Sequence, residues 1–203
     1  MGQYYKLCIL NSHKKNYPNS KKVEAYLESW EYNNGAKLCE FSWVGNHFVA
    51  TLEELINKEH GKYAYYPIIV AGDYADAEPL TLNGENWNIY ELAEKFGKEI
   101  KKSEAPKPHH YRYIINEDKK VFFDCERAYK QKMKYHDGSI EYWQMHPLAL
   151  LCSDGCNGGE SRGGGDYHHK HRMIGAWRRN VVVTSDNRPN EKEYREVYYK
   201  FYD

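Results

Sequence analysis

The chain has 203 residues, and its 29 basic side chains balance its 29 acidic ones, so the formal net charge is zero. A chain of this length can bury a substantial core as one domain or as two small ones. Because there is no net charge, there is no long-range attraction to nucleic acid or to an anionic membrane, and we expect no long nucleic acid among the partners. The halves differ, since residues 1–100 hold 10 basic side chains and residues 101–203 hold the other 19.

The sequence has no stretch approaching the roughly 20 apolar residues that span a bilayer, and the start MGQYYK lacks the apolar core of a signal peptide. Five cysteines, an odd number, favour reduced thiols over a disulfide framework. These features predict a cytoplasmic protein that makes no membrane contact. The 20 tyrosines and five tryptophans predict a folded aromatic core and a Tyr-rich surface of the kind that binds proteins.

The apolar spacing predicts regular elements throughout the first half. In chain order these are a strand at 4–10, a short helix or strand at 23–30, a strand at 37–44, a helix at 47–58, a strand at 65–71 and a helix from 88 to about 101. The last helix has the clearest start, because Asn88 can cap it and Glu91, three residues on, completes a capping box.

The second half follows a proline-containing connector at 103–108. Its predicted elements are a hairpin with strands at 111–116 and 121–123, a strand-like segment at 140–151 that Pro147 interrupts, a strand at 173–184 and a helix at 190–201. Each half closes on a β-branched strand followed by aspartate, VAGDYAD in the first and VVVTSDNR in the second.

Together these patterns predict an α+β protein with a mainly antiparallel sheet and a few helices. The shared order of elements has two interpretations. One is an internal duplication, with an N-terminal half-repeat at 1–103 and a C-terminal half-repeat at 108–203 packed as one globular unit. The other is chance similarity within a single α+β domain.

The most informative segment is CSDGCNGGESRGGGDY, residues 152–167, which holds six glycines in sixteen residues. Successive backbone N–H groups without side chains can form an anion-binding nest, and an arginine adds a bidentate donor for phosphate. We interpret the segment as a site for a small phosphorylated or nucleotide-like ligand, the alternative being a long flexible loop. The candidate ligand-binding residues are Arg162, Gly163, Gly164, Gly165, Asp166, Tyr167 and, from the first half, Asp73. The segment matches neither common nucleotide fingerprint, so no cofactor is predicted.

The same region offers metal ligands, because Cys152 and Cys156 are followed by His168 and His171. A structural zinc site needs four ligands held in a closed tetrahedron, and a loop with six glycines is a poor rigid scaffold. Zinc binding by these residues is therefore the less favoured interpretation, and a solvated polar strand is the alternative.

Acid–base chemistry has candidates as well. Asp73 ends the strongest predicted strand, a position where carboxylates act in many enzymes, and Asp166 lies in the glycine-rich segment. His146, before Pro147, is a further candidate, although a lone histidine is equally explained as a hydrogen-bonded structural residue. The sequence carries no motif for a nucleophile beside these residues.

Several motifs together resemble a family of small proteins from phages and bacterial genomes. They are the start MGQYYK, NGAKLCEFSWVGN at 34–46, VAGDYAD at 70–76, HPLALLCSDG at 146–155, RGGGDY at 162–167 and IGAW at 174–177. The chain departs from the family pattern by having GCNGGESRGGGDY in place of a shorter GNGRGGGDY, and Cys152 and Cys156 do not belong to the pattern. The resemblance implies a phage or mobile-element origin, which would make the expected location the cytoplasm of the host cell, and it assigns no activity.

Three functions are compatible with these observations. The first is binding of a small phosphorylated or nucleotide-like ligand by the glycine-rich segment. The second is protein–protein inhibition of a host factor or an anti-phage defence system through the Tyr-rich surface. The third is a hydrolase or transferase reaction that uses Asp73 and Asp166.

Overall fold

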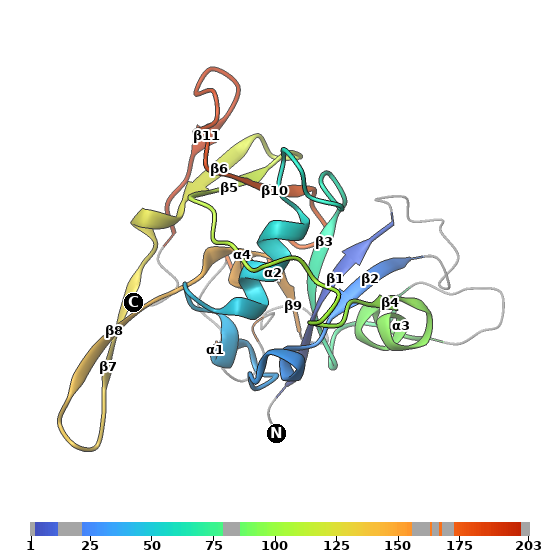
Figure 1. Cartoon of the computed structure of the whole chain (residues 1–203), viewed down its shortest axis with the longest axis horizontal. Helices are drawn as coiled ribbons and strands as arrows, with labels where there is room; N and C mark the ends of the chain where they lie inside the picture. The colour runs from blue at the N-terminus through green and yellow to red at the C-terminus, as the bar shows by residue number, and fades with distance from the viewer. Residues whose placement is uncertain are drawn as a thin grey trace.

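A computed structural model of the chain describes residues 3–11, 22–78, 86–155, 163, 167 and 173–199 (Figure 1). Within them, the α-helices are α1 (Leu38–Phe41), α2 (His47–Leu55), α3 (Ile89–Phe96) and α4 (Pro147–Leu151). The strands are β1 (Tyr5–Leu10), β2 (Val23–Leu27), β3 (Ile68–Gly72), β4 (Lys98–Glu99), β5 (Tyr113–Asn116), β6 (Val121–Asp124), β7 (Lys130–Lys134), β8 (Ile140–Gln144), β9 (Ser153–Asp154), β10 (Val182–Ser185) and β11 (Arg195–Glu196). The predicted α+β class is confirmed.

The first sheet has the strand order β4-β2-β1-β3-β9, with β1 antiparallel to both neighbours and the short edge strands β4 and β9 parallel to theirs. Helices cover both faces of this sheet (Figure 1). Leu7 and Ile9 belong to the core that contains α2 and α4, whereas Cys8 and Leu10 pack in the smaller core with α3. All six residues of β1 are therefore buried, and each such apolar side chain stabilises the fold by roughly 1.5–3 kcal/mol.

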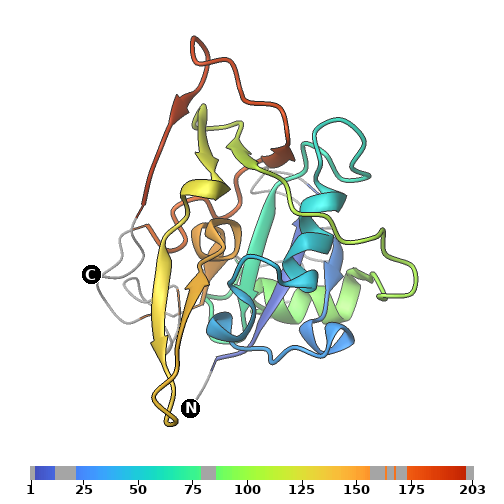
Figure 2. The ribbon, with the colours of Figure 1, turned by 60° about the vertical axis from the view of Figure 1, so that its left-hand side comes forward.

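The second sheet has the order β10-β5-β6-β11, in which only the β6–β11 pair is parallel. Its residues Ile114, Phe123 and Val182 join the same large core as β1 and α2. An isolated bridge between Pro67 and Val181 connects the two sheets, and one between Asn57 and Thr184 connects the residues after α2 to β10. The two sheets thus share one core, with α2 between them (Figure 2).

Strands β7 and β8 form a separate two-stranded ribbon that projects from the body of the molecule in both views (Figures 1 and 2). The sequence pattern predicts a strand near β8 but none at β7. Pro147 ends this region as expected. It lies at the first turn of α4, where its missing N–H costs nothing, so the predicted strand at 140–151 stops at residue 144 and continues as a helix.

The predicted strand at 37–44 is wrong, since residues 38–41 form α1. Leu38 and Phe41 are three residues apart, so one helical turn places both on the buried face. The carboxylate of Glu40 accepts the N–H of Lys37 at 2.8 Å, which satisfies a donor at the helix start. Only Trp43 retains strand character, in an isolated antiparallel bridge to Met145.

The predicted helix at 190–201 is also wrong for the described residues 190–199. Asn190 starts a single turn, in which its carbonyl accepts the N–H of Tyr194 at 2.9 Å. The chain then becomes extended, because Arg195 and Val197 donate their N–H groups to carbonyls of Lys120 and Phe122 along β6. Main-chain partners at the edge of an existing sheet outweigh the helical spacing of the apolar side chains.

Two further elements are shorter than predicted. The last strand is only β10, because residues 173–180 turn, with positive φ at Gly175 and Arg179. Helix α3 begins after the N-cap Asn88, which forms the predicted capping box with Glu91. The helix ends at Phe96, earlier than predicted, and β4 follows. The internal duplication and its half-repeats stay predictions. Within the described part of the chain, the helices are too short or too polar to cross a bilayer.

Candidate functional sites

The carboxyl ends of β3 and β9 bring the start of the glycine-rich segment next to Asp73. The two strands are parallel neighbours. Just after them the chains approach so closely that a Cβ atom on Gly72 would lie 2.8 Å from Cα of Gly155, a distance that excludes any side chain at residue 72. Ligands of α/β proteins bind where the carboxyl ends of parallel strands meet, so this edge is a candidate site.

Asp73 is held by the main chain at this edge. Its Oδ1 accepts the N–H of Tyr4 at 3.1 Å, and its carbonyl accepts a hydrogen bond from the Asn88 side chain at 2.9 Å. Partial burial raises the pKa of Asp73, and the main-chain N–H groups that bond to it oppose this rise. The carboxylate of Asp73 therefore links the residue before β1 to the end of β3.

Among the predicted ligand-binding residues of the glycine-rich segment, Gly163 and Tyr167 are described, and both are structural anchors. Gly163 and Tyr167 form an antiparallel bridge, and a Cβ atom on Gly163 would lie 2.5 Å from Cβ of Tyr167. The Tyr167 ring is buried, and its hydroxyl is 2.7 Å from that of Ser42. The other predicted ligand residues of the segment lie outside the described residues: Arg162, Gly164, Gly165 and Asp166.

The predicted zinc ligands are only partly described. Cys152 ends α4 and is fully buried, and burial raises the pKa of its thiol, which keeps the proton on sulfur at neutral pH. Cys156, His168 and His171 lie outside the described residues.

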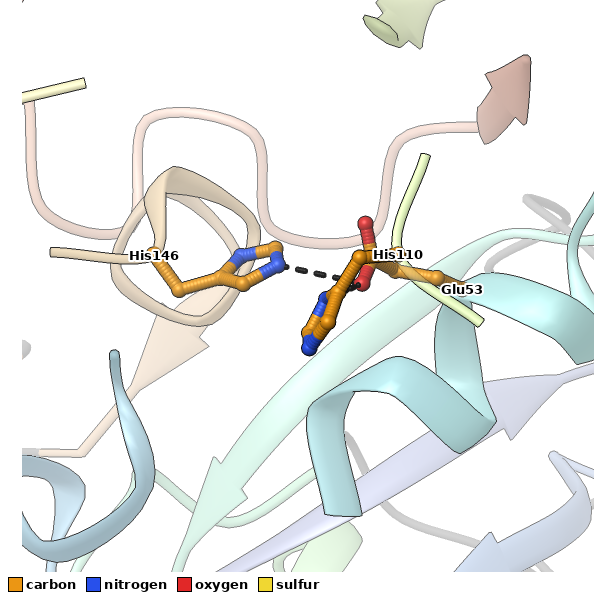
Figure 3. A group of neighbouring side chains, drawn as sticks. All are labelled: Glu53, His110 and His146. Atoms are coloured by element: carbon orange, nitrogen blue, oxygen red, sulfur yellow. Dashed lines mark hydrogen bonds and ion pairs between the residues drawn. The ribbon is translucent and has the colours of Figure 1, made fainter. Parts of the chain in front are cut away.

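A different cluster, which lies in the core, is Glu53, His110 and His146 (Figure 3). Glu53 lies on α2 and is completely buried. His110 lies between Pro108 and the start of β5, and His146 caps α4. Oε2 of Glu53 is 2.6 Å from Nδ1 of His110 and 3.1 Å from Nε2 of His146. One carboxylate oxygen thus joins three segments that are far apart in the sequence.

The outer nitrogens of both rings define the protonation of the cluster. Nε2 of His110 accepts the N–H of Gly45 at 3.0 Å, and Nδ1 of His146 accepts the N–H of Leu148 at 3.3 Å. A nitrogen that accepts a hydrogen bond carries no proton, so each ring is neutral and its proton is on the nitrogen that faces Glu53. Both histidines donate to the carboxylate, which also accepts the N–H of Tyr111 at 3.4 Å.

The pKa of Glu53 is the result of opposing effects. Burial alone would raise it, but His146 and His110 outweigh burial and lower the pKa below its ordinary value. The carboxylate is therefore ionised and fully hydrogen-bonded in the core. Removing one partner of such a buried ionic hydrogen bond typically costs about 1.5–3 kcal/mol.

The donor set resembles that of a metal site, because two imidazoles and a carboxylate present ligand atoms within 4.8 Å of one another. A metal-bound histidine, however, uses its other ring nitrogen to donate a proton. Here Gly45 and Leu148 require both outer nitrogens to accept, so a metal at the inner nitrogens would leave both rings without a proton. The residues therefore fit a hydrogen-bonded cluster and do not fit a metal centre.

The sequence indicates only one member of this cluster. His146 is a candidate for acid–base chemistry, and its position supports the alternative of a hydrogen-bonded structural residue. Glu53 has a local signal, since it lies four residues after Val49 and three before Ile56, on the apolar face of α2. His110 has no local signal, because its partners are brought to it by the fold.

The β7–β8 ribbon exposes charged and aromatic side chains on two distinct faces. Residues that are directly opposite share a face, and one face carries the pairs Lys130–Gln144, Lys132–Tyr142 and Lys134–Ile140. This lysine face holds no acidic side chain from either strand. Tyr142 is 64% exposed and Ile140 47% exposed.

The other face of the ribbon, the tryptophan face, carries Trp143 and Glu141. The Trp143 ring lies 5.8 Å from that of Trp43, and the Glu141 carboxylate accepts hydrogen bonds of 3.0 Å from Trp143 and from the Tyr135 hydroxyl. A surface hollow of about 560 Å³ lies beside β8 and is lined by Trp43, Val44, Glu141, Tyr142, Trp143 and Gln144.

Comparisons with known proteins assign none of these sites, since no protein-family model, curated protein or solved structure matches the chain.

Proposed function

We propose that this chain is an interaction protein that binds another protein through the β7–β8 ribbon. The observation that carries the proposal is the exposure of the aromatic and apolar side chains of β8, above all Tyr142. A two-stranded hairpin is only marginally stable by itself in water, and large exposed apolar groups add an aggregation hazard. Exposed tyrosine and tryptophan side chains are, conversely, the residues that contribute most to protein–protein binding.

The resemblance to phage proteins supports a particular kind of partner. A protein of phage or mobile-element origin can act by binding a protein of the host, and the partner that we propose is a host factor or a component of an anti-phage defence system. Binding would inhibit it by occupying its surface, which requires no catalytic group in this chain.

Site-specific photo-crosslinking tests this function. A photoreactive phenylalanine analogue replaces Tyr142 in the full chain, which is expressed in the host and irradiated. The control carries the same analogue at Tyr4, which is 50% exposed and directly precedes β1 of the first sheet. We expect one major crosslinked protein from position 142 and none from position 4. Equal crosslinking from both positions, or none from either, would contradict the proposal.

A second candidate function is binding of a small phosphorylated or nucleotide-like ligand by the glycine-rich segment. The observation that favours it is the close approach of Gly72 and Gly155, because this contact holds the first residues of the segment beside Asp73. Native mass spectrometry of the freshly purified chain tests it: a mass excess of a few hundred daltons that Arg162→Ala abolishes would support the site, whereas the bare mass would favour the protein-binding function. Catalysis by Asp73 and Asp166 stays a prediction, because only Asp73 is described.

A further inference from the structure

The outer edge of β8 exposes main-chain hydrogen-bonding groups. The ribbon register is marked at both ends, where the N–H of Tyr135 bonds to the carbonyl of Ser139 and the N–H of Met145 bonds to that of Tyr129. Since antiparallel pairs alternate between bonded and non-bonded, the odd-numbered residues of β8 bond to β7 and the even-numbered residues face outward. The outward carbonyl of Gln144 agrees with this, because it accepts the N–H of Val44 at 2.8 Å.

Ile140 and Tyr142 are the outward residues without such a partner. Among the residues that the structure describes, no hydrogen bond engages their N–H or C=O groups. Each residue offers one donor and one acceptor, so the edge presents four main-chain groups in register. Edge strands of this kind are usually shortened, bulged or covered, and an open one is a template for a strand from another chain.

A third strand already starts beside β8 but does not continue. Trp43 forms an antiparallel bridge to Met145, and Val44 bonds to Gln144, after which the chain turns away at Gly45, whose φ is 96°. The hollow of about 560 Å³ lies where this strand would have continued. The hollow is therefore a groove along β8 that is about as wide as one strand, and residues 43 and 44 close one end of it.

The two faces of the ribbon define which side chains an added strand would carry. Alternate residues of a strand lie on opposite faces, so its residues opposite Ile140 and Tyr142 would lie on the lysine face, within reach of Lys132 and Lys134. The residues between them would lie on the tryptophan face, against Trp143. Acidic side chains complement the first face, and apolar side chains complement the second.

We infer that the outer edge of β8 binds an extended segment of the partner protein, in which acidic and apolar residues alternate, as an added β-strand. This inference rests on the proposed function and specifies the partner segment. Main-chain pairing supplies the affinity, and the alternating side chains supply the specificity.

Fluorescence anisotropy with the full chain and a labelled synthetic nonapeptide of alternating glutamate and valine tests the inference. The controls are a peptide of the same composition with glutamates and valines in separate blocks, an alternating lysine–valine peptide and a single-stranded oligothymidylate. We expect the alternating acidic peptide to bind at least tenfold more tightly than each control. Equal affinity for the block peptide, or tighter binding of the oligonucleotide, would overturn the inference.

Variants of Ile140 test the main-chain pairing itself. Ile140→Pro removes an outward N–H and leaves the bonds to β7 intact, whereas Ile140→Thr retains the N–H and removes most of the apolar side chain. We expect Ile140→Pro to weaken the peptide at least tenfold and Ile140→Thr to weaken it less than threefold. On the lysine face, Lys132→Glu should weaken the acidic peptide and strengthen the lysine–valine peptide, and unchanged affinities would contradict that face's role.

Crosslinking separates this inference from the proposed function. If Ile140→Pro also removes the crosslinked partner of position 142, both stand. If the partner remains in Ile140→Pro, the ribbon binds through its side chains alone, so the inference fails and the proposed function stands. If position 142 crosslinks no more than position 4, the proposed function fails.

Discussion

Oε2 of the Glu53 carboxylate lies 2.6 Å from Nδ1 of His110, although the two residues are 57 positions apart. The contact joins α2, between the sheets, to the residues just before β5, where the second half of the chain begins. Because His146 bonds to the same oxygen, the carboxylate also holds the start of α4. A buried charge at this point is tolerated only because every ring nitrogen around it has a partner.

Replacing Glu53 by glutamine tests this connection. An amide oxygen at the position of Oε2 can still accept both ring N–H groups, but the amide NH2 then takes the place of Oε1 and faces the N–H of Tyr111. Two donors therefore oppose each other, and both imidazoles lose the negative charge of their acceptor. We expect the free energy of unfolding of Glu53→Gln to fall by about 2–3 kcal/mol at pH 7, measured by urea denaturation. Glu54→Gln is the matched control, since Glu54 is the next residue and bonds to the exposed His60 and to the Tyr111 hydroxyl, which an amide oxygen can also accept; its cost should be under about 1 kcal/mol. Equal losses in both variants would contradict the role of the cluster.

The pH dependence of stability follows from the lowered pKa of Glu53. Since the pKa is lower in the folded than in the unfolded chain, its contribution is fully present above the unfolded value and is lost as the pH falls through the folded one. The stability difference between the wild type and Glu53→Gln should therefore be constant from pH 7 to about pH 5 and shrink only below about pH 4.5. Urea denaturation at a series of pH values measures it. A difference that already shrinks between pH 7 and pH 6 would assign the effect to the histidines.

Added zinc should not stabilise the protein through this cluster, because the outer ring nitrogens accept main-chain N–H groups. We expect the same melting temperature with zinc, with a chelator and with neither. If zinc does raise it, His146→Gln and Cys156→Ser locate the ion. Loss of the effect in His146→Gln would contradict our interpretation of the core cluster, and loss in Cys156→Ser would place the metal in the glycine-rich segment.

Lys6 offers a separate test of buried charge, on the α3 side of the first sheet. It pairs with Glu28 and, at 3.0 Å, with Glu94, and its ammonium lies 4.1 Å from the centre of the Tyr90 ring. Burial would lower the pKa of Lys6, but the two carboxylates outweigh it and raise the pKa, so the side chain stays charged.

We expect Lys6→Met to lose about 3–5 kcal/mol of stability, because it leaves Glu28 buried without its cation. The double variant Lys6→Met/Glu28→Gln should recover part of that loss, which thermal or urea unfolding can measure as a double-mutant cycle. Additive losses in the double variant would mean that the pair contributes nothing beyond its separate side chains.

The elements with local signals can be predicted from the sequence alone. Strands β1 and β3 follow from their apolar runs, the β5–β6 hairpin from two such runs with a short turn, and the start of α3 from the capping box of Asn88 and Glu91. In each case residues within a few positions of one another supply both the pattern and the hydrogen-bond partners.

The other features depend on tertiary contacts, because their partners are distant in sequence. The extended chain at Arg195 forms because its N–H groups bond to carbonyls along β6, and β9 forms because it pairs with the edge of β3. The ionised Glu53 depends on two histidines from other segments. The open edge of β8 likewise cannot be predicted from its own sequence, because it depends on which other strands pair with β8 in the folded protein. Burial and main-chain pairing between distant segments carry free energies as large as local propensity, and a local pattern contains neither.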